Sequence, residues 1–149
     1  MTGGVADKSI RVSVPSDPAY LGIVRALVEC VARLAGFAEP EVSHVVVALD
    51  EACTNIIRHQ YEGRRDERID IEALLDLEAG RVQFVLRDYG PVRDPKHFRG
   101  RDLADVRPGG LGLHIIRKVM DEVEYSAAPG GGMLLKLCKR ACRQTGQEG

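Results

Sequence analysis

A carboxylate and a carboxamide stand four residues apart in this chain, at Glu51 and Asn55. In a helix, residues four apart lie on consecutive turns of one face, so both side-chain oxygens can reach one small site. A pair of this kind suits a metal-assisted reaction, because hard cations such as Mg²⁺ prefer oxygen ligands. The alternative is a solvated helix face with ordinary polar residues, and the pair alone does not exclude it.

The segment around this pair has the pattern of an amphipathic helix. At 3.6 residues per turn, Glu51 and Asn55 share one side with His44 and His59, and apolar residues occupy the other side. Pro40 suits the first position of such a helix, because its φ angle is already close to the helical value. The helix is expected over residues 41–61, with core positions at Val42, Val45, Val46, Leu49, Ala52, Cys53 and Ile56.

Two glycine motifs flank a long segment that has no sustained period. Asp88-Tyr-Gly90 ends a strand pattern, and Gly109-Gly-Leu-Gly-Leu113 opens a helical one. Residues 91–109 hold three prolines and many charges, and so long a structureless connection is more often a functional lid than a bland surface insertion. Free N–H groups at a glycine-rich helix start suit a phosphate chain, although such a cluster is also typical of a turn or a cap.

Periodicity predicts the elements that hold these residues in place. Asp17-Pro18 supplies a cap and a first-turn proline for a helix that runs to about Leu34. From Arg68 the period is two, as expected for an antiparallel hairpin with one buried face. Strands are expected at 9–14, 68–77, 82–86, 123–127 and 133–138. The expected core residues are Ile23, Val24, Leu27, Val31 and Leu34 in the helix and Ile69, Ile71, Ala73, Leu75, Leu77, Val82, Phe84 and Leu86 in the hairpin.

The order strand, helix, helix, hairpin, lid, helix, hairpin predicts an α+β fold in two layers. We expect a mixed, mostly antiparallel sheet with the helices on one face. A chain of 149 residues, 44% of them hydrophobic, is long enough for one domain with a sizeable core. The domain is expected over 9–139 with its lid at about 91–109, between a disordered N-terminus at 1–8 and a disordered tail at 140–149.

Composition narrows the class of protein. A net charge of −1 gives no electrostatic case for direct nucleic-acid binding. No apolar run reaches the roughly 18 residues of a membrane span, and the N-terminus lacks the layout of a signal peptide. These features predict a cytoplasmic protein. The four cysteines form no Cys-x-x-Cys pair, and Cys30 and Cys53 fall on expected core faces, so we expect buried free thiols rather than zinc or disulfides.

Three separated motifs therefore occur in a specific order: Glu-x-x-x-Asn at Glu51, Asp-x-Gly at Asp88 and Gly-Gly-Leu-Gly-Leu at Gly109. Together they resemble the N, G1 and G2 boxes of the Bergerat-fold, histidine-kinase-like ATPases, the superfamily of gyrase, Hsp90, histidine kinases and MutL. Two stretches resemble the anti-sigma-factor serine/threonine kinases of the RsbW type in particular. They are Asp50-Glu-Ala-Cys-Thr-Asn-Ile-Ile-Arg-His-Gln-Tyr61 and Gly110-Leu-Gly-Leu-His-Ile-Ile-Arg-Lys-Val-Met-Asp-Glu-Val123.

The resemblance implies a role for each matching residue. Glu51 would be the general base or a water-positioning carboxylate, and Asn55 would bind Mg²⁺. Asp88 would accept the adenine amino group of ATP, with Gly90 leaving room for the base. Phosphoryl transfer needs mainly positioning and charge neutralisation, for which one carboxylate and one metal suffice. The phosphates would be bound by the backbone N–H groups of Gly110, Leu111 and Gly112 and, from the lid, by Arg107.

Proteins of this type bind a sigma factor and hold it inactive. They also phosphorylate a small STAS-domain antagonist on serine or threonine, and the unphosphorylated antagonist releases the sigma factor. The resemblance therefore implies ATP and Mg²⁺ as cofactors, a sigma factor and a STAS-domain antagonist as partners, and a homodimer.

Two alternatives stay open. One is an ATP-binding regulatory switch module that acts by partner binding, for example phosphatase activation, without kinase activity. Glu51 favours the kinase, because a pure binder needs no base. The other is the catalytic domain of a histidine kinase or of a DNA-processing ATPase.

Overall fold

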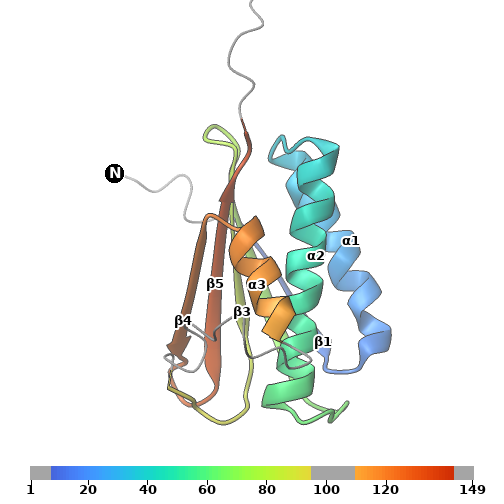
Figure 1. Ribbon diagram of the computed structural model, residues 1–149, viewed down its shortest axis with the longest axis vertical. Helices are drawn as coiled ribbons and strands as arrows, with labels where there is room; N and C mark the ends of the chain where they lie inside the picture. The colour runs from blue at the N-terminus through green and yellow to red at the C-terminus, as the bar shows by residue number, and fades with distance from the viewer. Residues whose placement is uncertain (1–7, 95–109, 143–149) are drawn as a thin grey trace, which may run out of the picture.

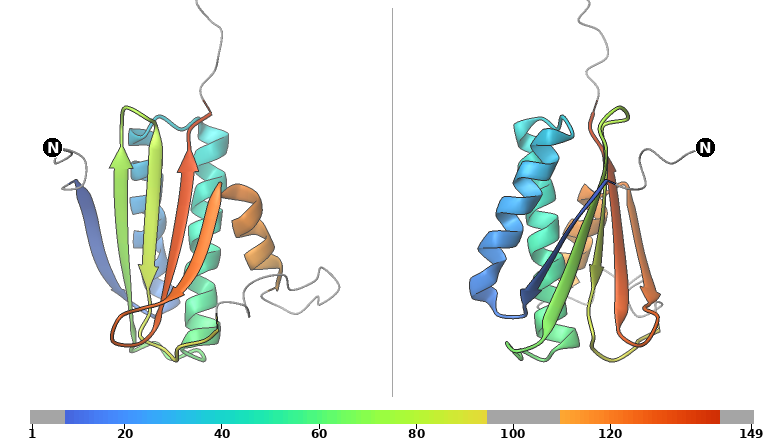
Figure 2. Two further views of the ribbon diagram at one scale, coloured as in Figure 1. Left: turned by 90° about the vertical axis from the view of Figure 1, so that its left-hand side faces the viewer. Right: turned by 180° about the vertical axis from the view of Figure 1, so that it is seen from behind.

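A computed structural model describes residues 8–94 and 110–142 of the chain, with residues 110–113 described by their backbone alone. In these ranges a five-stranded sheet has α1, α2 and α3 packed on one face (Figure 1), and Figure 2 shows its other face without helices. The strands are β1 (Ser9–Pro15), β2 (Arg68–Asp76), β3 (Arg81–Arg87), β4 (Glu122–Ala127) and β5 (Met133–Arg140). The helices are α1 (Leu21–Leu34), α2 (Glu39–Asn55) and α3 (Gly110–Val119), with short helical turns η1 (Pro18–Tyr20) and η2 (Ile56–Gln60).

The predicted two-layer α+β fold is confirmed, and the described sheet is antiparallel throughout rather than mixed. The strand order is β1-β2-β3-β5-β4, and each pair of neighbours runs antiparallel. β4 and β3 run in the same direction, but β5 lies between them. The final hairpin thus places its second strand against β3, and no two described neighbours are parallel.

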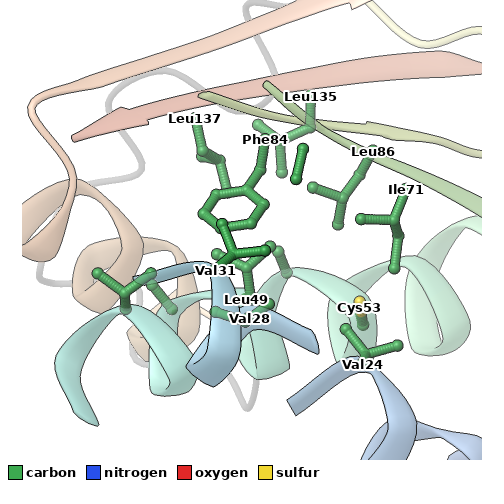
Figure 3. Packing of buried hydrophobic residues seen from close by; sticks show 14 of the residues in the cluster. Val24, Val28, Val31, Leu49, Cys53, Ile71, Phe84, Leu86, Leu135 and Leu137 are labelled. Atoms are coloured by element: carbon green, nitrogen blue, oxygen red, sulfur yellow. The ribbon is translucent and has the colours of Figure 1, made fainter. Parts of the chain in front are cut away.

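The core lies between the sheet and the helices. Figure 3 shows side chains of β2, β3 and β5 meeting those of α1 and α2, with Phe84 pointing toward Val31. The period-2 pattern predicted the buried face of the hairpin correctly up to Leu75 in β2, but the prediction is wrong for Leu77. β2 ends at Asp76, so Leu77 falls in the turn and is exposed.

Helix α1 buries a stripe that matches the predicted one only in part, because Val24 and Val31 are in the core as predicted and two other residues are not. Ile23 and Leu34 were expected in the core, yet they are 54% and 62% exposed. The reason is geometric, because α1 packs along α2 and only the side facing α2 and the sheet is covered. The buried residues of α1 are Leu21, Val24, Val28, Val31 and Ala32.

Four free cysteines occupy two kinds of environment. Cys53 and Cys138 are buried, whereas Cys30 and Cys142 are exposed. The expectation of a buried Cys30 is therefore wrong, for the same geometric reason as for Ile23. Burial raises the pKa of the Cys53 thiol to about 12, so this thiol stays protonated and serves as a small apolar core residue.

Helix α2 changes its winding where the polar pair ends. Its expected core positions are buried apart from Val46, which is half-buried. The regular helix stops at Asn55, and in η2 the amide of Tyr61 donates to the carbonyl of Ile56, five residues back, at 3.0 Å. The predicted α-helix to Tyr61 is thus a π-turn in its last part. Turns of this kind are frequently found at functional sites.

The end of the domain extends further than the sequence predicts. β5 continues to Arg140, the Ala141 amide donates to the carbonyl of Gly80 at 2.8 Å, and the Cys142 amide donates to Glu41 at 3.2 Å. The rest of the expected tail, 143–149, lies outside the described residues, as do 1–7 and most of the expected lid, 95–109. None of the described helices is long and apolar enough to cross a membrane.

Candidate functional site

Four segments that are distant in the sequence point to one end of the molecule. The end of α2 with η2, the end of β3, the turn between β4 and β5 and the start of α3 all lie toward the lower end of Figure 1, and Figure 2 agrees. Hydrogen bonds to Asp88 link three of these segments, and α3 packs on α2. The fold therefore brings the three predicted motifs to the same end of the domain.

Glu51 and Asn55 lie on consecutive turns of α2, as predicted, and both are half-buried. The side-chain oxygen Oδ1 of Asn55 is buried and accepts no hydrogen bond from any described residue. A buried acceptor without a partner costs about 1–3 kcal/mol, so it calls for an explanation, and a bound ion would be one. An uncommitted amide oxygen fits Mg²⁺, which takes oxygen ligands and few of them from protein.

Asp88 is 3% exposed, and only one of its two carboxylate oxygens, Oδ1, accepts hydrogen bonds from the described residues. Oδ1 accepts hydrogen bonds from the Gln60 side-chain amide at 3.0 Å, the Gly90 amide at 3.0 Å and the Met133 amide at 3.2 Å. No donor among the described residues contacts Oδ2. A carboxylate fixed in this way keeps a second oxygen that can accept an N–H group of a ligand.

Tyr61 joins the end of the long helix to the segment after β3. Its buried hydroxyl donates to the carbonyl of Arg68 and accepts from the Tyr89 amide at 2.8 Å. Burial raises the pKa of the Tyr61 phenol to about 12, so the hydroxyl keeps the proton that it donates. The backbone on the C-terminal side of Asp88 is thereby anchored to the helix that carries Asn55.

Tyr89 is the central residue of the Asp-x-Gly motif, and two arginine side chains contact its ring. The guanidinium groups of Arg68 and Arg87 lie 4.5 and 4.7 Å from the ring centroid, within the range of cation–π attraction. The Tyr89 hydroxyl donates to Asp70 and accepts from Arg68 at 2.6 Å. Arg87 also donates to the carbonyl of Pro129 at 2.7 Å, so the turn between β4 and β5 is tied to the same cluster.

Two glycines near Asp88 have packing reasons for lacking a side chain. A Cβ atom at Gly90 would lie 2.9 Å from the carbonyl oxygen of Gln60. The structure thus gives Gly90 a reason inside the protein, besides the room for a base that the resemblance implies. A Cβ atom at Gly132 would lie 2.0 Å from the carbonyl oxygen of Asp88, and the φ angle of Gly132 is +86°.

Gly132→Ala should lower the free energy of unfolding by at least about 3 kcal/mol, because it adds a backbone clash to a strained φ. Gly131→Ala is the matched control. Its φ is +115° with no atom within 4 Å of the added Cβ, so it should cost only about 1–2 kcal/mol. Urea denaturation of both variants measures the difference. Equal losses would mean that the contact between Gly132 and Asp88 is not tight in solution.

The remaining predicted phosphate contacts are only partly described. Gly110, Leu111 and Gly112 form the first turn of α3, where backbone N–H groups have no partner within the helix. Anions bind well at such a turn. Arg107 lies outside the described residues.

Sequence reasoning missed Gln60 and Met133, which donate to Asp88, and Arg93, which donates to Gln60. Gln60 had a detectable signal, because it is a polar residue four positions after the buried Ile56, on the core side of the helix. Arg93 and Met133 had none. Their contacts depend on which segments the fold brings together, and no local pattern encodes that.

The fold and the site define a class of protein, the histidine kinase-like ATPase domain. The chain matches the family of that description over residues 14–139, from the end of β1 into β5. Its fold is similar to a crystal structure of the RsbU and RsbW domains of a Mycobacterium tuberculosis protein, with a TM-score of 0.63 and 18% sequence identity. That similarity covers 89% of this chain and 32% of the longer one, and it concerns the fold alone.

Curated relatives narrow the class. The chain is 31% identical over 129 residues to the serine-protein kinase RsbW of Bacillus pumilus, covering 81% of this chain and 80% of the relative. It is 30% identical over 130 residues to that of Bacillus subtilis, covering 81% and 79%, and 29% identical over 140 residues to that of Halalkalibacterium halodurans, covering 89% and 83%. The chain belongs to the RsbW family of histidine kinase-like ATPases, which confirms the predicted family.

Proposed function

We propose that this protein is an ATP- and Mg²⁺-dependent serine/threonine kinase that also acts as an anti-sigma factor. It sequesters a sigma factor and phosphorylates a STAS-domain antagonist, so the phosphorylation state of the antagonist decides whether the sigma factor is free. The names of its relatives, which are serine-protein kinases, support the kinase activity. It works in the cytoplasm as a homodimer, with one ATPase domain over 9–139 and a lid at about 91–109.

The orphaned oxygen of Asn55, one helical turn from Glu51, is the observation that carries this proposal. A helix that only packed against its neighbours would lose stability by burying an unpaired acceptor. A helix that binds a cation would recover that cost when the ion arrives. Gln60, in the π-turn η2 that directly follows α2, donates to Asp88. The proposed metal site and the proposed adenine site are therefore parts of one unit.

The residues then divide the work of phosphoryl transfer. Asn55 Oδ1 would be the protein ligand of Mg²⁺, which would supply charge neutralisation on the phosphates. Glu51 accepts or orients the proton of the attacking serine or threonine hydroxyl. Asp88 Oδ2 would accept a hydrogen bond from the adenine amino group. The backbone of Gly110, Leu111 and Gly112 and the side chain of Arg107 would bind the phosphates.

Asp88→Asn should weaken ATP binding by about 10- to 100-fold and should not weaken GTP binding. The three donors around Oδ1 hold the amide oxygen of Asn in that place, so an NH₂ group replaces the free acceptor. An NH₂ group repels the adenine amino donor but not the guanine carbonyl. Competition titrations with a fluorescent ATP analogue measure both affinities, and an equal loss for ATP and GTP would contradict the base-reading role.

Incubation with radiolabelled ATP, Mg²⁺ and the STAS-domain proteins of the same genome tests the function, with Glu51→Gln in parallel. Label on one STAS protein that vanishes with Glu51→Gln is the expected result. It would establish the kinase and identify the antagonist together. ATP binding without transfer to any STAS protein would instead favour the switch module that acts by partner binding.

A further inference from the structure

Gln60 is a buried polar residue that no catalytic role explains. It is 5% exposed, in the π-turn η2, on the side of the helix that faces the core. Both ends of its carboxamide are engaged. The NH₂ group donates to Asp88 Oδ1 at 3.0 Å and to the Pro91 carbonyl at 2.9 Å, and the oxygen accepts from Arg93 Nε at 2.6 Å.

These partners fix the orientation of the Gln60 amide. The flipped amide would place its oxygen against two acceptors and its NH₂ group against a guanidinium, so only one orientation satisfies every group. Arg93 is itself held, because a second guanidinium nitrogen donates to the carbonyl of His59 at 3.2 Å. Gln60 is therefore a rigid donor toward Asp88.

Gln60 supplies the one side-chain donor to Asp88 among the described residues, beside two backbone amides. Three donors on Oδ1 leave Oδ2 as the oxygen that is free for a ligand. Removing the Gln60 donor would let the carboxylate turn or draw in water, and Oδ2 would no longer be presented in one position. The close packing of Gly90 on Gln60 keeps this donor in place.

We propose that Gln60 is a positioning residue for purine selectivity. It holds Asp88 so that Oδ2 of Asp88 accepts a hydrogen bond from the amino group of adenine and disfavours the carbonyl of guanine. This inference rests on the proposed binding of ATP at Asp88. It adds a residue of the π-turn that acts through Asp88 and does not touch the nucleotide. Through Pro91 and Arg93, the same side chain ties the base-reading carboxylate to the segment that follows Gly90.

Gln60→Met tests this role, because Met has a similar length and no polar end. We expect ATP affinity to fall about five- to tenfold, with GTP and Mg²⁺-tripolyphosphate bound as by the wild type, and KM for ATP to rise while kcat stays constant. Gln83→Met, the same change in β3, is the matched control and should leave the ATP to GTP ratio unchanged. Arg93→Ala removes the partner of the Gln60 oxygen, together with a bond to the His59 carbonyl, and leaves the Gln60 donor to Asp88 in place. It should shift the ratio in the same direction by about two- to threefold.

A double variant separates positioning from packing. In Asp88→Asn, intact Gln60 should keep the Asn oxygen on the three donors and its NH₂ group toward the base, which favours GTP. In Gln60→Met with Asp88→Asn, the Asn amide can flip, so the preference for GTP should shrink by at least about threefold. Thermal unfolding of each variant confirms that a folded protein is compared.

The outcomes distinguish this inference from the function on which it rests. A wild-type protein that binds neither ATP nor GTP would refute the proposed function. ATP binding by the wild type with an unchanged ATP to GTP ratio in Gln60→Met would overturn the role of Gln60 and leave the function standing. An equal loss of affinity for ATP, GTP and tripolyphosphate would likewise overturn it, because a general structural role would lower all three affinities together.

Discussion

Glu51→Gln should bind Mg²⁺ and ATP like the wild type and transfer phosphate at least about a hundredfold more slowly, the usual range for the loss of a general base being about 10²–10⁴. The substitution keeps the shape and one oxygen but removes the charge that accepts a proton. Glu51 pairs with no cation among the described residues, so its charge neutralises no neighbour and the fold should not change.

Single-turnover transfer to the antagonist, together with an ATP titration, separates the two effects in Glu51→Gln. Asp50→Asn is the matched control, since this adjacent carboxylate binds Arg25 at 2.7 Å in an exposed ion pair. Loss of such a pair costs little, so the control should transfer phosphate at nearly the wild-type rate. An unchanged rate of phosphate transfer by Glu51→Gln would refute the proposal that Glu51 is the general base.

Asn55→Ala should abolish Mg²⁺-dependent ATP binding, with the affinity in Mg²⁺ falling by at least about a hundredfold to the value measured in EDTA. The loss of the only proposed protein ligand leaves nothing in α2 to hold the ion. The free protein should become more stable by about 1 kcal/mol, because an unpaired buried acceptor disappears and Ala is the better helix former. Function and stability then move in opposite directions, as at many active sites.

Isothermal titration with and without Mg²⁺, and urea denaturation of the free protein, test both halves of the Asn55→Ala prediction. Asn55→Asp keeps an oxygen ligand and should retain part of the Mg²⁺ dependence. Thr54→Ala, the neighbouring half-buried residue on α2, should change neither quantity by more than about twofold or 0.5 kcal/mol. Normal Mg²⁺-dependent binding by Asn55→Ala would refute the metal assignment.

The sequence by itself determined what local periodicity encodes. The alternation after Arg68 and the 3.6-residue repeat around Glu51 predicted the type and inner face of β2, β3 and α2, because a strand or helix must bury its apolar side. The spacing of Glu51 and Asn55 placed them on consecutive turns for the same reason. Order along the chain was sufficient for the two-layer fold, since hairpins and helices of these lengths have few ways to pack.

Only the tertiary structure decided which surfaces meet. Period alone marked Ile23 and Leu34 as core, but the position of α1 beside α2 leaves them in solvent. The contacts of Asp88 reach Gln60 across 28 residues and Met133 across 45, and no local rule predicts them. The side chain of Gln60 finds its partners in segments that the folded sheet brings to the end of α2, so the bonds that hold the Asp88 carboxylate exist only in the folded domain.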